Sequence, residues 1–416
     1  MAEGAFFLYP FSMWCIVEGG HMSQISLKQS LAKLGFAIFL TYLSVAMALP
    51  VVSVFVTEEL KLPNWLGGAA VGVSFVATIL SRKHAGNFAD AKSSKKCFML
   101  GFFFYMAAAL VCMAADISGM SASVAFAILI AGRLLLGIGE SMATVGLLSW
   151  HFSRLGPSQS GKILSILGMA MYGTFSLGGP VGLTLYKYFG FSSVMLASSI
   201  VPILGVIMFL TAPEVVPHKT TEAKKSFLNL LGTIWKQGFA VMLQGVGFAV
   251  LGAFISLYFK DQGWPYAGIG LSLFGIGFVI SRILFGSLPD KIGGVKVALV
   301  SLVVETVGQS LLWLAPHYSL ALIGALLTGL GCSMIYPAMG VEVIKIVSPE
   351  QRGTAFGGFS MFQDIAYAFS APIAGLLADN FSYSSTFLFG FIAAVVGIII
   401  VRSMRINNLP INSTAK

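Results

Sequence analysis

The sequence predicts an all-α membrane protein with twelve transmembrane helices in two pseudo-symmetric six-helix bundles. Three observations support this prediction: the composition, twelve long apolar runs and a repeat between the two halves of the chain. Of its 416 residues, 57% are hydrophobic and 10% charged, whereas soluble domains carry about 25% charged residues. A chain this apolar cannot cover its surface with polar groups in water, but a lipid-facing surface needs no such cover.

Each predicted span is close to the roughly 20 apolar residues that cross a bilayer. The first six lie at 31–56, 66–83, 97–115, 122–152, 160–187 and 192–212. The second six lie at 237–259, 267–285, 297–315, 319–346, 354–378 and 384–403. Residues 227–236 are predicted to form a short interfacial helix that leads into the seventh span.

The longest polar interruption divides the chain into two similar halves. The predicted parts are an N-terminal extension (1–21), a first six-helix bundle (22–212), a cytoplasmic linker (213–226), a second bundle (227–403) and a cytoplasmic tail (404–416). The extension has no Lys or Arg and too short an apolar stretch for a signal peptide or a span. We expect it to be disordered or interfacial, with Met22 as the true start.

The distribution of basic residues predicts the orientation. If both termini are cytoplasmic, 21 of the 25 Lys and Arg residues lie on that side, and only Lys61, Lys187 and Lys260 lie outside. Arg133 remains within the membrane. Positive residues favour the cytoplasmic side, so the bias predicts a multi-pass protein of the bacterial inner membrane with both termini inside.

The two halves repeat each other at positions that rarely match by chance. At an offset of 200, SRKHAGNFAD from Ser81 aligns with SRILFGSLPD from Ser281. At an offset of 192, seven further Gly, Ser, Pro and Gln positions match, from Gly137 with Gly329 to Pro180 with Pro372. With six spans in each half, these are parallel repeats, and the interface between them is the expected substrate path.

Two loops and two spans carry a family resemblance. GNFADAKSSKK from Gly86 resembles, in degenerate form, the loop signature of the major facilitator superfamily, and GSLPDKIGG from Gly286 is closer to it. GRLLLGIGES from Gly132 resembles the fourth-span motif, and LGGPVG from Leu177 resembles the fifth-span motif of drug/proton antiporters. LQGVGFAV, GGVKVALVSLVVETVG and FQDIA look like the YhhS type, once grouped with arabinose-efflux proteins.

The resemblance, which runs from about Met22 to the end, implies the major facilitator fold and secondary active transport. It implies that the two loops hold the cytoplasmic gate, through Gly86, Asp90, Gly286 and Asp290. It also implies that the fourth span lines the central cavity. By the same analogy, possible cavity-lining residues are Tyr42, Gln244, Tyr336 and Gln363.

Charged residues deep in the spans are the candidate substrate and proton-coupling site, because a central charge costs roughly 3 kcal/mol and needs a partner, water or a function. Arg133 and Glu140 lie seven residues apart on one predicted helix, and Asp364 lies deep in the eleventh span. We expect all three to face one cavity between the halves. The alternative for Arg133 and Glu140 is a fixed ion pair that ties helices together, and the alternative for Asp364 is a structural carboxyl group hydrogen-bonded near Tyr336 or Tyr172. Glu305 is assigned a structural role, and Glu342 a pairing with Lys345.

These features predict proton-coupled efflux of a small organic solute by alternating access. Proton-coupled uptake by symport is the alternative. An integral membrane enzyme or a non-transporting receptor or scaffold is less favoured, because the five histidines are scattered and the deep charges are paired. No phosphate-binding loop, metal site or cofactor motif is present. The expected partners are the solute, protons and lipid, with no nucleic acid, and the expected state is a monomer.

Overall fold

The computed structural model describes residues 24–155, 160–210, 213–214, 227–348 and 352–404, and every regular element in these ranges is helical. The first half contains α1 (Gln24–Val54), η1 (Phe55–Glu59), α2 (Asn64–Ala91), α3 (Ser94–Met113), η2 (Ala114–Asp116), α4 (Ala122–Leu155), α5 (Ser160–Gly173) and α6 (Phe175–Phe209). The second half contains α7 (Phe227–Asp261), α8 (Ala267–Phe285), α9 (Leu288–Ile292), α10 (Gly294–Trp313), α11 (Tyr318–Ile346), α12 (Arg352–Asn380) and α13 (Tyr383–Arg402). The predicted extension, and most of the linker and tail, fall outside the described residues.

The helices of the described residues account for the twelve predicted spans once one long stretch is divided in two. Eleven stretches of the described chain are long and apolar enough to span a membrane, and one of them, Ser165–Phe209, has 45 residues. Gly190 breaks this stretch with φ 79° and ψ −178°, a backbone conformation that Gly adopts readily. The chain reverses there, so α5 with the first part of α6 forms the fifth crossing and the rest of α6 forms the sixth. The predicted all-α fold is therefore confirmed.

Three predicted boundaries were wrong. The first span is predicted to begin at residue 31, but α1 begins at Gln24. The second span was expected to end at residue 83, but α2 continues to Ala91, because the polar residues after 83 stay helical beyond the apolar run. The separate interfacial helix at 227–236 is absent, since α7 is continuous from Phe227 to Asp261. No Pro interrupts α7, so the apolar and polar parts form one helix.

Small residues bring the helices of each half together in the same way. Gly137 of α4 lies against the Ser74 carbonyl of α2, and Gly329 of α11 lies against the Phe274 carbonyl of α8. The two glycines match at the offset of 192. Such residues allow backbones to approach closely in membranes, where no hydrophobic force drives helix association. The repeat in sequence is thus also a repeat in packing.

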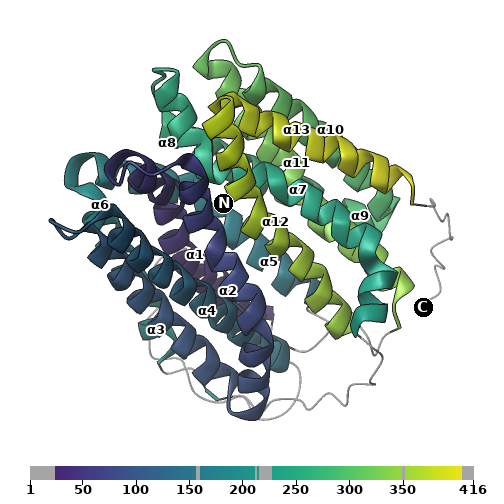
Figure 1. Cartoon of the computed structure of the whole chain (residues 1–416). Helices are drawn as coiled ribbons and strands as arrows, with labels where there is room; N and C mark the ends of the chain where they lie inside the picture. Colours follow the sequence, from purple (N-terminus) through teal and green to yellow (C-terminus); the bar gives the residue numbers. More distant parts are fainter. Residues whose placement is uncertain (1–23, 156–159, 211–212, 215–226, 349–351, 405–416) are drawn as a thin grey trace, which may run out of the picture.

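The two halves meet along α2 with α12 and along α5 and α6 with α8 (Figure 1). We call the face where α1 begins and α13 ends the terminal side, and the other face the opposite side. In the part of α2 that begins at the opposite side, Gly68 and Gly72 contact the backbone of α12 at Ala371 and Ala368, respectively. The halves are therefore packed tightly at the opposite side.

Candidate functional site

An ion pair joins the halves near the middle of the molecule. Arg82 of α2 and Asp364 of α12 lie 2.7 Å apart (Nη2 to Oδ2). Arg82 is nine residues before the end of α2 and Asp364 is twelve residues into α12, which places them about 13 Å and about 18 Å from the terminal ends of their helices. Their side chains are 29% and 13% exposed, and the Asp364 oxygen that faces Arg82 is itself buried.

The repeat explains how Arg82 comes to this place. Its counterpart, Arg282 of α8, donates from Nη2 to the Ser333 carbonyl at 2.6 Å and lies over the Phe278 ring. Arg282 also approaches α5 of the other half at Gly168. Both arginines therefore lie at an interface between halves. At the offset of 192, the position equivalent to Asp364 is Tyr172, so only one of the two arginines faces a carboxylate.

Glu140 of α4 lies beside this pair. It is 7% exposed, and it accepts a hydrogen bond of 2.8 Å from the Tyr42 hydroxyl of α1. It is within electrostatic range of Arg82 and Arg133, and Asp364 is within range of Glu140. Two acids and one half-buried arginine therefore share a centre between the halves.

Arg133 does not contact this centre directly. Its guanidinium donates to the Ala70 carbonyl at 2.9 Å and to the Val71 carbonyl and Ser74 hydroxyl at 3.2 Å, all on α2. The residue is 1% exposed. The prediction that Arg133 faces a cavity between the halves is not what the structure shows. Arg133 instead connects α4 to α2 inside the first half.

Gln363 belongs to a polar and aromatic cluster that also crosses the interface. Its amide donates to the hydroxyls of Tyr172 on α5 at 2.9 Å and Tyr367 on α12 at 2.7 Å. The two tyrosine hydroxyls contact each other. Phe248 of α7 packs edge-on against both rings. The cluster can present hydroxyls, an amide and ring faces to a small solute.

The remaining predicted residues lie in different places. Tyr336 shares a 2.7 Å hydrogen bond with Ser360 and is within electrostatic range of Arg82 and Asp364. Gln244 is buried in the core of the second half. Of the loop residues, Asp90 and Asp290 are exposed near the terminal ends of α2 and α8, with Gly86 and Gly286 one turn earlier. Glu342 pairs with Lys345 at 2.8 Å, as predicted.

Three residues of the site were missed as site residues by the sequence analysis: Arg82, Tyr172 and Tyr367. Arg82 lies at the end of the predicted second span (66–83), where a basic residue is expected to mark the cytoplasmic side of the membrane. Its duplication at Arg282 was a signal that this arginine has a defined place. No comparable signal marked the tyrosines, because a Tyr in an apolar helix is common in packing.

The opposite side is held closed by polar contacts between halves. Asp379, at the end of α12, accepts hydrogen bonds from the backbone N–H of Asn64 (2.8 Å) and of Trp65 (3.0 Å), the first residues of α2. It thereby caps a helix of the other half. Lys260 at the end of α7 pairs with Glu58.

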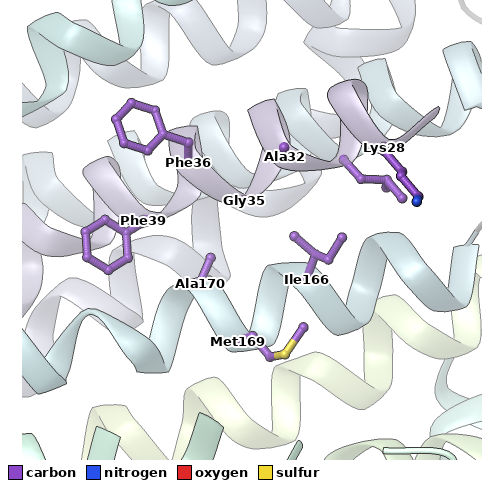
Figure 2. A pocket seen from close by; sticks show the side chains of 9 residues that line it. Lys28, Ala32, Gly35, Phe36, Phe39, Ile166, Met169 and Ala170 are labelled. Carbon is purple, nitrogen blue, oxygen red and sulfur yellow. The ribbon is translucent and has the colours of Figure 1, made fainter. Parts of the chain in front are cut away.

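A separate groove lies between α1 and α5, with a volume of about 610 Å³. Figure 2 shows Phe36 and Phe39 of α1 along it, Ile166 and Met169 on α5, and Lys28 at one end. Lys28 is the only charged residue in its lining. The groove is therefore apolar and adds no charged group to the centre between the halves.

Comparisons with known proteins agree with this architecture. The family model described as Major Facilitator Superfamily matches residues 34–293 and 238–413. The chain belongs to the major facilitator superfamily. This major facilitator chain is 39% identical over 380 residues to an uncharacterized MFS-type transporter of Salmonella typhimurium, covering 91% of this chain and 97% of that protein. It is 33% identical over 369 residues to one from Burkholderia mallei, covering 86% and 88%.

Solved structures share the fold at low sequence identity. A point mutant of the nucleoside transporter NupG has a TM-score of 0.73 at 16% identity, covering 90% of this major facilitator chain and 99% of that one. A bacterial homologue of the human lysosomal transporter Spinster, inward-facing and unoccupied, has a TM-score of 0.70 at 14% identity, covering 92% and 98%.

Proposed function

We propose that this chain exports a small organic solute across the bacterial inner membrane in exchange for protons, with its terminal side in the cytoplasm. The observation that carries the proposal is the Arg82–Asp364 pair, which joins the two halves deep in their helices. A charge at this depth has a large energetic cost unless it is paired or hydrated. Protonation of Asp364 removes its charge and releases Arg82.

The exchange follows from competition at one centre. With Asp364 ionised, Arg82 holds the halves together and the proton site is empty. A proton on Asp364 breaks the pair and leaves Arg82 and Glu140 facing the cavity, where the loss of an inter-half contact favours the alternative conformation. The tyrosines and Gln363 at the same interface supply the contacts for the solute. The fifth-span LGGPVG motif supports export and the antiporter-like branch of the family.

The proposal is tested by transport into proteoliposomes with an imposed pH gradient. The substrate is first selected by binding from radiolabelled organic acids, nucleosides, sugars and cationic drugs. Antiport predicts accumulation when the lumen is acidic, whereas symport requires an acidic exterior. We expect Asp364→Asn to abolish gradient-driven accumulation while retaining counterflow of solute against solute. The exposed control Asp261→Asn is expected to retain both activities.

Two outcomes would overturn the proposal. If Asp364→Asn and Glu140→Gln each keep full gradient-driven transport, neither acid is an obligatory proton carrier. If accumulation follows only an acidic exterior, the protein is a symporter and the direction is wrong.

A further inference from the structure

A second deep carboxyl group lies inside the second half, away from the interface. Glu305 of α10 is fully buried, and neither carboxyl oxygen accepts a hydrogen bond from an N–H or O–H group. Two glycines make room for it. A methyl group on Gly247 of α7 would lie 2.5 Å from Glu305 Oε1, and one on Gly331 of α11 would lie 2.5 Å from the Glu305 backbone nitrogen.

The surroundings of Glu305 are polar but contain no basic group. Its side chain and that of Gln244 both interact with the Cys332 thiol. Gln309, one turn along α10, donates hydrogen bonds from its amide nitrogen to the Thr328 hydroxyl (3.3 Å) and to the Gly247 carbonyl (3.4 Å). Gln244 Oε1 is buried without a partner. Among the described residues, Cys332 is the only titratable group that acts on Glu305.

The equivalent pair of positions in the first half also holds one carboxyl group, but on the other helix of the pair, and there its charge is balanced. At the offset of 200, Glu305 corresponds to Tyr105, and at 192, Cys332 corresponds to Glu140. Tyr105 and Glu140 interact, as Glu305 and Cys332 do. Glu140, however, has the Tyr42 donor and two arginines in range. Glu305 has neither, so its charge must be neutralised by something that is not a side chain of the described helices.

We propose that Glu305, supported by the free amide oxygen of Gln244, is a binding site for a small monovalent cation, either a proton or Na⁺. Carboxyl and amide oxygens suit hard cations. The described residues contain no group of three or more His, Cys, Asp or Glu side chains that could hold a metal ion, so a Na⁺ ion here would depend on the Glu305 carboxylate and on amide and backbone oxygens. Binding would neutralise the carboxylate and satisfy its oxygens, which ties α7, α10 and α11 together. The site is separate from Asp364 and does not depend on the direction of transport.

The test is thermal unfolding of the full-length protein in nanodiscs, in NaCl, KCl or choline chloride at equal ionic strength, from about pH 6 to about pH 9. A Na⁺ site predicts that Tm rises with NaCl but not with KCl at alkaline pH. A proton site predicts that Tm rises on acidification whatever the salt. In either case Glu305→Gln, a neutral isostere, is expected to lose that component of the shift, and Asp261→Asn to keep it. Equal responses in wild type and Glu305→Gln would overturn the proposal.

A second measurement uses the wild-type protein and so does not require the variant to fold. Dicyclohexylcarbodiimide modifies protonated carboxyl groups in apolar surroundings, and peptide mass spectrometry locates the adduct. We expect labelling of Glu305 that falls at alkaline pH for a proton site, or on addition of NaCl for a Na⁺ site, with no labelling of the exposed Asp261. Labelling of Glu305 that changes neither with pH nor with the Na⁺ concentration would contradict cation binding. Because neither readout measures transport, failure of the antiport proposal leaves them unaffected.

Discussion

At the scale of single residues, the three buried or partly buried acids differ in what surrounds them. Asp364 faces Arg82 across the interface, Glu140 accepts a hydrogen bond from Tyr42, and Glu305 faces only the Cys332 thiol. The sequence shows that all three acids lie far from the ends of apolar spans, which is unusual for a charged residue. It could not reveal which cation each one faces, because that depends on how helices from the two halves are rotated against one another.

Arg133 is predicted to be a stability residue. Removing its guanidinium deletes three hydrogen bonds to α2 and leaves an unfilled space, and hydrogen bonds from charged groups contribute about 1.5–3 kcal/mol each. We expect Arg133→Gln to lower the unfolding free energy by about 2–4 kcal/mol, measured as a fall in Tm. The exposed Arg154→Gln on the same helix should change Tm little. A normal Tm with altered proton coupling in Arg133→Gln would instead support the direct role predicted from the sequence.

At the scale of helices, the apolar runs were sufficient to predict the number of crossings and most boundaries. The errors lie where polar residues continue a helix beyond the apolar run, as in α2 and α7. Hydropathy shows which residues suit the bilayer, but it does not show where the helix ends. The error in α2 had a functional consequence, because it placed Arg82 at the edge of the membrane and not deep in a helix. The repeated glycines, by contrast, were correct guides to close packing between helices.

The close contact of α4 with α2 at Gly137 leads to a matched pair of variants. A methyl group at Gly137 would collide with the Ser74 carbonyl, whereas one at Gly86 on α2 meets nothing within 4 Å. We expect Gly137→Ala to destabilise the protein by about 1–3 kcal/mol through overpacking. Gly86→Ala should be neutral or stabilising by up to about 1 kcal/mol, because Ala favours helix. Similar melting temperatures for the two variants would show that α4 and α2 are not packed this tightly.

At the scale of the whole molecule, the halves are fastened at the opposite side by helix backbone contacts, the Asp379 cap and the Lys260–Glu58 pair. The repeat predicted an interface between halves as the transport path. It could not predict this asymmetry between the two sides, since contacts between halves depend on the conformation that the protein adopts. Alternating access requires that these contacts separate during the cycle.

A reversible cross-link tests that separation. Glu58→Cys and Lys260→Cys, joined by a short disulfide-forming reagent that a reductant cleaves, should arrest transport in the pH-gradient assay, because the opposite side can no longer open. Reductant should restore it, and each single-cysteine variant should remain active after the same treatment. Continued transport by the fully cross-linked protein would show that these helix ends need not part.

The Arg82–Asp364 pair is expected to hold this conformation, and loss of the Asp364 charge to release it. The most direct test is the distance distribution between spin labels at Ser118→Cys and Gln262→Cys, exposed positions on the opposite side of the two halves, measured by double electron–electron resonance in nanodiscs. We predict that Asp364→Asn at alkaline pH, and acidification of the protein with Asp364 intact, both increase the population of the longer distance. Distributions that stay unchanged under both conditions would contradict this role for the pair.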